Sequence, residues 1–72
     1  MTKTYRLVDW MRSYLSNHKD LEFTAHELLS EVPADKLPGQ KLQDVRNTLN
    51  HLMRMGEVVV VHDEGAYYAI NL

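Results

Sequence analysis

The chain has 72 residues, of which 44% are hydrophobic and 25% are charged, and its formal net charge is −2. This is an ordinary globular composition, and the length predicts one domain, residues 1–72, with a thin core. The absence of cysteine excludes disulfides, thiolate metal sites and a cysteine nucleophile. No apolar run approaches the ~20 residues that span a bilayer, so we expect a cytoplasmic protein with no membrane partner.

The charges are segregated along the chain. Residues 1–19 and 36–54 each carry a net charge of +3, whereas residues 20–35 carry −5 and residues 55–72 carry −3. Local electric fields depend on this segregation more than on the mean charge. The two positive segments contain the first and the third of the helices predicted below.

The first predicted helix covers Tyr5 to Ser16. Residues Asn17 to Asp20 then break its pattern, and the alternating segment Leu21-Glu22-Phe23 is expected to add a short edge strand to a small sheet. Trp10 is expected at the edge of the helix's apolar stripe. The stripe itself has helical spacing and consists of Leu7, Val8, Met11, Tyr14 and Leu15.

A capping box marks the start of the second predicted helix. The Thr24 hydroxyl is expected to accept a hydrogen bond from the Glu27 amide, while the Glu27 carboxylate accepts one from the Thr24 amide. Pro33 ends this helix because it lacks an amide proton and disfavours the α conformation of its predecessor. Residues 33–39 form a loop longer than the 3–4 residues of the simplest helix-turn-helix. The buried side of the helix carries Leu28, Leu29 and Val32.

The third predicted helix ends at Gly56, since glycine adopts the left-handed conformation after a helix without steric cost. Arg46 flanks its polar face, and Met11, Met53 and Met55 are interpreted as core-filling residues. The apolar face consists of Leu42, Val45, Leu49, Leu52 and Met53, and the opposite, polar face consists of Gln43, Asn47, Asn50 and Arg54.

A β-hairpin is predicted after this helix. The loop Asp63-Glu64-Gly65 pairs His62 with Ala66, and therefore Val60 with Tyr68 and Val58 with Ile70, with Gly65 at positive φ. This register places the more apolar face inward, and that face carries Val58, Val60, Tyr68, Ile70 and Leu72. The outer face is still rather apolar and carries Glu57, Val59, Val61, Tyr67, Ala69 and Asn71.

This α+β order of helix, short strand, helix, loop, helix and hairpin resembles the winged helix-turn-helix domains of small bacterial and phage transcription regulators. The segment from Leu42 to Leu52, followed by Met55-Gly56-Glu57-Val58, is similar to the family's recognition helix running into its wing. The resemblance implies a three-helix winged helix-turn-helix with a C-terminal β-hairpin wing. It also implies that the third helix enters the major groove of double-stranded DNA, while the wing touches the neighbouring backbone or minor groove.

Carried over by position, the resemblance implies base-edge contacts from Gln43, Asn47 and Asn50, and phosphate contacts from Lys41, Arg46 and Arg54. These residue types suit such roles, because amides bond bidentately to adenine and cationic side chains release counterions from phosphates. Any exposed helix face also carries Arg, Asn and Gln, so the place of this helix in the winged-helix order is what favours DNA contact. The sequence departs from the family at the wing tip, where Asp63 and Glu64 stand instead of Arg or Lys.

Other functions find less support in the sequence. The four histidines show no i, i+4 pair, so we expect no metal site and no cofactor. The glycines are isolated and form no phosphate-binding loop, and we expect no enzyme. The main alternative is a protein-binding winged helix with an acidic wing and no direct DNA binding. A homodimer is also considered, with a surface formed by Val59, Val61 and Tyr67.

Overall fold

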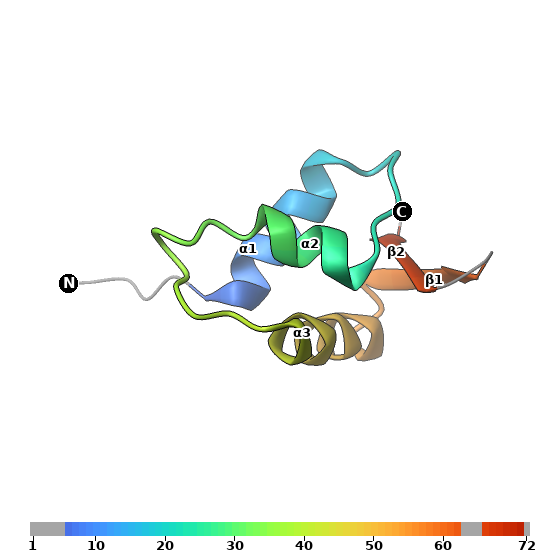
Figure 1. Ribbon diagram of the computed structural model, residues 1–72. Coiled ribbons are helices and arrows are strands. Elements are labelled where there is room, and N and C mark those ends of the chain that lie inside the picture. Colours follow the sequence, from blue (N-terminus) through green and yellow to red (C-terminus); the bar gives the residue numbers. More distant parts are fainter. Residues whose placement is uncertain (1–5, 63–65, 72) are drawn as a thin grey trace.

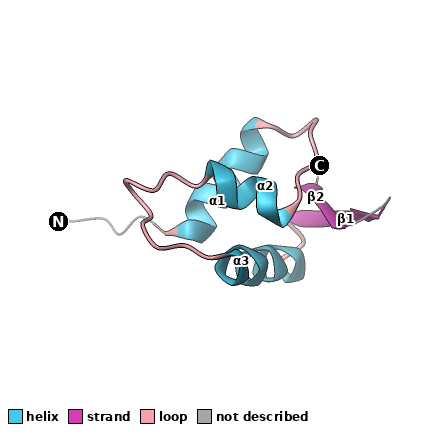
Figure 2. Cartoon of the chain, viewed as in Figure 1, coloured by secondary structure: helices cyan, strands magenta, loops and turns pink. Residues whose placement is uncertain are grey.

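The computed structural model describes residues 6–62 and 66–71, which form three helices and a β-hairpin (Figure 1). The helices α1 and α2 lie on one side of α3, the hairpin lies at one end of the molecule, and the loop between α2 and α3 lies at the other end (Figure 2). In chain order the elements are α1 (Leu7–Asn17), α2 (Ala25–Glu31), α3 (Leu42–Arg54), β1 (Val58–His62) and β2 (Ala66–Ile70). The helices and the hairpin follow the predicted order. None of these helices, within the described ranges, has the length and hydropathy of a membrane span.

Helix α1 begins after Arg6, whose backbone is extended, and it ends one residue later than predicted. Tyr5, the predicted first residue, lies outside the described residues. His18 terminates the helix: its backbone N–H donates to the Leu15 carbonyl, and its Nδ1 lies 2.8 Å from the Tyr14 carbonyl oxygen. A carbonyl oxygen only accepts, so Nδ1 carries the proton that it donates.

The predicted capping box of α2 is confirmed. The Glu27 amide donates to Thr24 Oγ1 at 3.1 Å, and the Thr24 amide donates to Glu27 Oε1 at 2.8 Å. The helix ends at Glu31, and Val32 is extended, as expected for a residue before proline. Residues 32–41 then connect α2 to α3.

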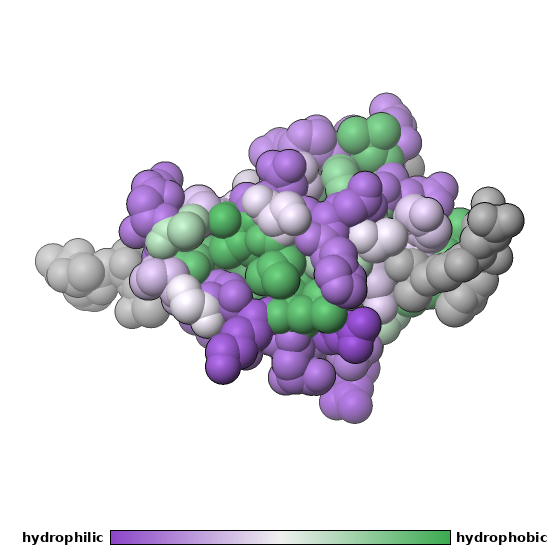
Figure 3. Space-filling model, in the orientation of Figure 1, coloured by the Kyte–Doolittle hydropathy of each residue, from purple (hydrophilic) through white to green (hydrophobic). Residues whose placement is uncertain are grey.

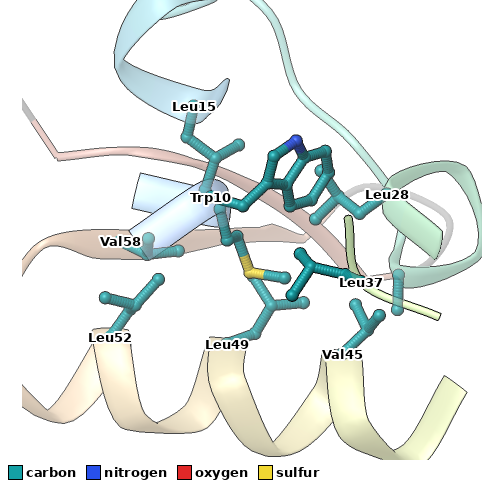
Figure 4. Packing of buried hydrophobic residues seen from close by; sticks show 10 residues of the cluster. Trp10, Leu15, Leu28, Leu37, Val45, Leu49, Leu52 and Val58 are labelled. Atoms are coloured by element: carbon teal, nitrogen blue, oxygen red, sulfur yellow. The ribbon is translucent and has the colours of Figure 1, made fainter. Parts of the chain in front are cut away.

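The core lies between the three helices and β1 (Figure 4). Trp10 is buried rather than at the edge of its stripe, and Leu37 of the α2–α3 loop is also buried, at 6% exposure. Met55 was expected in the core, but its side chain is 53% exposed. Met55 lies three residues after the buried Leu52. At 100° per residue, its side chain points about 60° away from that of Leu52 around the helix axis, on the side away from the other buried residues. The α3 residues that point into the core are Val45, Leu49 and Leu52.

The predicted hairpin register is confirmed: Val58 pairs with Ile70, Val60 with Tyr68 and His62 with Ala66. The predicted edge strand is reduced to a single bridge, in which Phe23 and Tyr68 exchange backbone hydrogen bonds of 3.0 and 2.7 Å. Because Tyr68 uses its backbone groups on Phe23, the bridge lies on the side of β2 opposite β1. The predicted positive φ of Gly65 and the wing-tip residues Asp63 and Glu64 lie outside the described residues.

Candidate nucleic-acid interface

Helix α3 has one buried and one exposed face. All six residues predicted from the sequence to contact DNA are exposed. The helix runs along one side of the molecule (Figure 1). The face of α3 that is opposite the exposed residues carries the side chains that enter the core (Figure 4). Five of the six predicted residues lie on the exposed side of the helix, and Lys41 is the N-cap residue that precedes it. We call this set the α3 face, and it consists of Lys41, Gln43, Arg46, Asn47, Asn50 and Arg54.

The first turn of α3 is held by its own side chains. The Asp44 carboxylate accepts a 2.8 Å hydrogen bond from the backbone N–H of Lys41, and the Thr48 hydroxyl donates to the Asp44 carbonyl at 2.8 Å. This places a negative charge beside the helix N-terminus, where the helix dipole stabilises it. The Lys41 side chain makes no capping hydrogen bond and is exposed.

The cations of the α3 face differ in their ion pairs from the arginines of the first positive segment. Among the described residues, Lys41, Arg46 and Arg54 form no ion pair. By contrast, Arg6 lies 3.3 Å from Asp9, and Arg12 is paired with both Asp9 and Glu57. The arginines of the first positive segment are thus neutralised locally, whereas those of α3 keep their field.

Two amides of the α3 face are bonded to each other. Gln43 Nε2 donates to Asn47 Oδ1 at 2.9 Å, as the i, i+4 spacing on a helix allows. Sequence reasoning did not name this bond. It also did not name His51, which is exposed four residues after Asn47 and lies at the border of the same surface.

The start of the hairpin is fixed to α1 and α3 by contacts that the sequence did not predict. Arg12 donates to Glu57 through Nε at 2.6 Å and through Nη2 at 3.1 Å, and this hydrogen bond raises the pKa of the Arg12 guanidinium above its ordinary value. The Asn71 side chain donates to the Gly56 carbonyl at 2.8 Å, and its backbone N–H donates to the Glu57 carbonyl at 2.9 Å. The base of the wing therefore has a defined position relative to the end of α3.

Apolar surface occurs away from the α3 face. On the outer sheet face, Val59 is 38% exposed, while Val61 and Tyr67 are half-buried. A hydrophobic patch also lies between α2, the loop after it and the upper edge of α3, whereas the lower side of α3 is hydrophilic (Figure 3). This loop borders an open hollow of about 200 Å³, lined by Leu29, Val32, Ala34, Leu37, Gly39 and Gln40.

No protein-family model and no curated protein matches the sequence. A solved structure, that of a ferric uptake regulator from Francisella tularensis with iron, is similar, with a TM-score of 0.78 and 17% sequence identity. The match covers 97% of this chain, which spans about half (54%) of that chain. The likeness concerns the fold, and it confirms the three-helix winged helix-turn-helix class. In the described part of this chain, no three His, Cys, Asp or Glu side chains gather into a group that could hold a metal ion.

Proposed function

We propose that this chain is a sequence-specific DNA-binding domain of a transcriptional regulator, with α3 in the major groove of double-stranded DNA. The observation that carries this proposal is the α3 face, where exposed amides lie among cations that have no acidic partner in the described residues. Major grooves admit one α-helix, and winged helices of this shape present their third helix there.

The two kinds of side chain have different roles in this proposal. Lys41, Arg46 and Arg54 neutralise phosphates and set the orientation of the helix, while the amides of the face read base edges. The Asp44 carboxylate, the acid within the helix, accepts a hydrogen bond from the backbone at the first turn, and its charge is partly offset there. The base readers are Gln43, Asn47 and Asn50.

The second candidate function is a protein-interaction module, and the apolar outer sheet face favours it. Val59 and its neighbours offer a surface for a partner or for a second copy of the chain. A homodimer is compatible with DNA binding as well, because two-fold symmetric proteins bind paired half-sites. The two functions differ in whether the isolated chain binds duplex DNA.

The first test measures phosphate contact. Arg46→Ala and Arg54→Ala should each weaken binding to random duplex and reduce the slope of log K against log salt by about 0.9, since one counterion fewer is released. Lys19→Ala is the matched control, because Lys19 is an exposed cation on the turn after α1. That segment and α3 lie on opposite sides of the molecule (Figure 1). It should leave the slope unchanged. Equal slopes for wild type and both arginine variants would remove phosphate contact from the proposal.

A further inference from the structure

The hydrogen bond between Gln43 and Asn47 links two side chains in the first two turns of α3. The N-terminal residues of a recognition helix are the ones that reach base edges in helix-turn-helix complexes. Gln43 is the second residue of the helix, and it has the longer side chain of the two. It is therefore the amide of this pair that extends further toward a bound duplex.

A primary amide has two N–H donors and one carbonyl acceptor. Gln43 uses one N–H on Asn47 and keeps its Oε1 and its second N–H. The bidentate contact to adenine needs one acceptor for N6–H and one donor for N7, and these are the groups that Gln43 retains. The bond to Asn47 is thus compatible with adenine recognition by Gln43.

Asn47 is used differently. Its Oδ1 accepts from Gln43, so this oxygen points along the helix toward Gln43. A bidentate contact from Asn47 itself would require the same oxygen to face adenine. Asn50 forms no side-chain hydrogen bond with a described residue, and it keeps its amide free.

We propose that Gln43 reads adenine, and that Asn47 is the positioning residue that holds the Gln43 amide in the reading orientation. This inference rests on the proposed function, and within it changes the role of Asn47 from a direct base reader to a positioning residue. A side chain already held in its bound rotamer loses less conformational freedom on binding, and the held amide presents a fixed order of acceptor and donor. The pair then acts as one unit, in which either truncation removes most of the discrimination.

The test is a double-mutant cycle on the preferred duplex, selected first with the wild-type chain. Gln43→Ala should weaken binding about 5- to 150-fold, the range of one lost bidentate base contact. After Gln43→Ala, adding Asn47→Ala should weaken binding little further, because the side chain that Asn47 positions is already gone. The matched control pair is Gln43→Ala with Asn50→Ala. Its double variant should lose affinity by the product of the two single fold-losses.

A second readout distinguishes reading from structural support. Gln43→Glu replaces the donor by an acceptor, and a carboxylate accepts from cytosine N4. The variant should shift its preference from adenine to cytosine at one position of the site, and leave the other positions unchanged. All these residues are exposed, so circular dichroism should show wild-type helix content throughout.

The outcomes separate the inference from the proposed function. If the fold-losses in affinity of Gln43→Ala and Asn47→Ala multiply in the double variant, the inference is overturned while DNA binding stands. A Gln43→Ala variant that keeps every base preference would overturn it in the same way. A wild-type chain that binds no duplex at all would overturn the proposed function and the inference together. The expected result is that the double variant loses less affinity than the product of the two single losses, and that Gln43→Glu shifts its preference from adenine to cytosine.

Discussion

Gly56 sets the end of α3 and the start of the wing. Its φ is +76°, its N–H donates to the Met53 carbonyl, and the next N–H, of Glu57, donates to the Leu52 carbonyl, each at 3.0 Å. These two bonds form a Schellman motif with glycine at the C′ position. The same turn places the Gly56 carbonyl where the Asn71 side chain reaches it. One backbone conformation thus fixes both the helix end and its contact with Asn71, the residue after β2.

Gly56→Ala should destabilise the fold by about 1–2 kcal/mol, the cost of a left-handed conformation for an L-residue. A Cβ at this position meets nothing within 4 Å, so the loss arises from backbone strain and not from a clash. Gly56→Asn should lose less, because asparagine tolerates this region. Urea unfolding measures both variants.

Gly39→Ala is the control for this substitution, since Gly39 has the same φ of +76° and equally open surroundings. It should lose a similar amount of stability, while only Gly56→Ala should also disturb the wing and alter duplex binding. An unchanged urea midpoint for Gly56→Ala would contradict the strain argument.

Helical periodicity predicted the candidate site at the level of single residues. It placed Gln43, Asn47 and Asn50 opposite the buried side chains, and the structure exposes all three. It could not predict the pair between Arg12 and Glu57, because these residues are far apart in sequence and only the packing of α1 against the end of α3 brings them together. The contact of Gln43, Asn47 and Asn50 with DNA stays a prediction.

At the scale of elements, local signals were reliable where the interactions are local. The capping box of α2, the end of α3 and the hairpin register depend on residues near one another in the chain, and all three were confirmed. The burial of Leu37 was missed, because this residue lies in a loop without periodicity. Phe23 forms one bridge instead of a strand, since the described segment around it makes no second pair with β2.

Thr24→Ala should destabilise the protein by about 1 kcal/mol, because it removes the side-chain acceptor for the Glu27 amide at the start of α2. Helix α2 is short, so its first turn is a large part of it. Ser30→Ala is the matched control: Ser30 is an exposed hydroxyl residue of the same helix that bonds the His26 carbonyl. It should change the urea midpoint little, and an equal loss for both variants would refute the capping explanation.

The outer sheet face leads to a prediction about assembly. Replacing Val59 and Tyr67 by Lys should shift a homodimer toward monomer without loss of helix content. Both positions lie on this face beside their cross-strand partners, Ala69 and Val61. Leu21→Lys is the control, since Leu21 is 50% exposed on the turn after α1. Sedimentation velocity measures the mass, and a wild-type monomer at working concentrations would exclude this dimer.

At the scale of the whole molecule, the ion pairs are distributed unevenly among the cations. The cations of the α3 face have no acidic partner among the described residues, whereas Arg6 and Arg12 are paired. The net charge of −2 therefore does not argue against a nucleic-acid partner, because a duplex approaching α3 meets the local field first. The wing tip carries the opposite sign, with Asp63 and Glu64 in sequence just beyond β1.

The wing charges separate the two candidate functions. If α3 binds DNA, replacing Asp63 and Glu64 by Lys should raise affinity for random duplex and steepen its salt dependence, as each added cation can displace a counterion. If the domain binds a basic protein partner, the same substitution should slow association with that partner and create no appreciable duplex binding. Gly65 stays unchanged, so the loop keeps its glycine.

The measurement is a titration of wild type and the double Lys variant against random duplex at two salt concentrations. Asp20→Lys combined with Glu22→Lys is the matched control, since it makes the same change of charge in the segment after α1. Attraction through net charge alone would raise affinity equally in both double variants, whereas a wing close to the phosphates should raise it more in the wing variant, because screening limits each charge to about 10 Å at 0.1 M salt. No binding by any of the three proteins would leave the protein-interaction module as the function consistent with this fold.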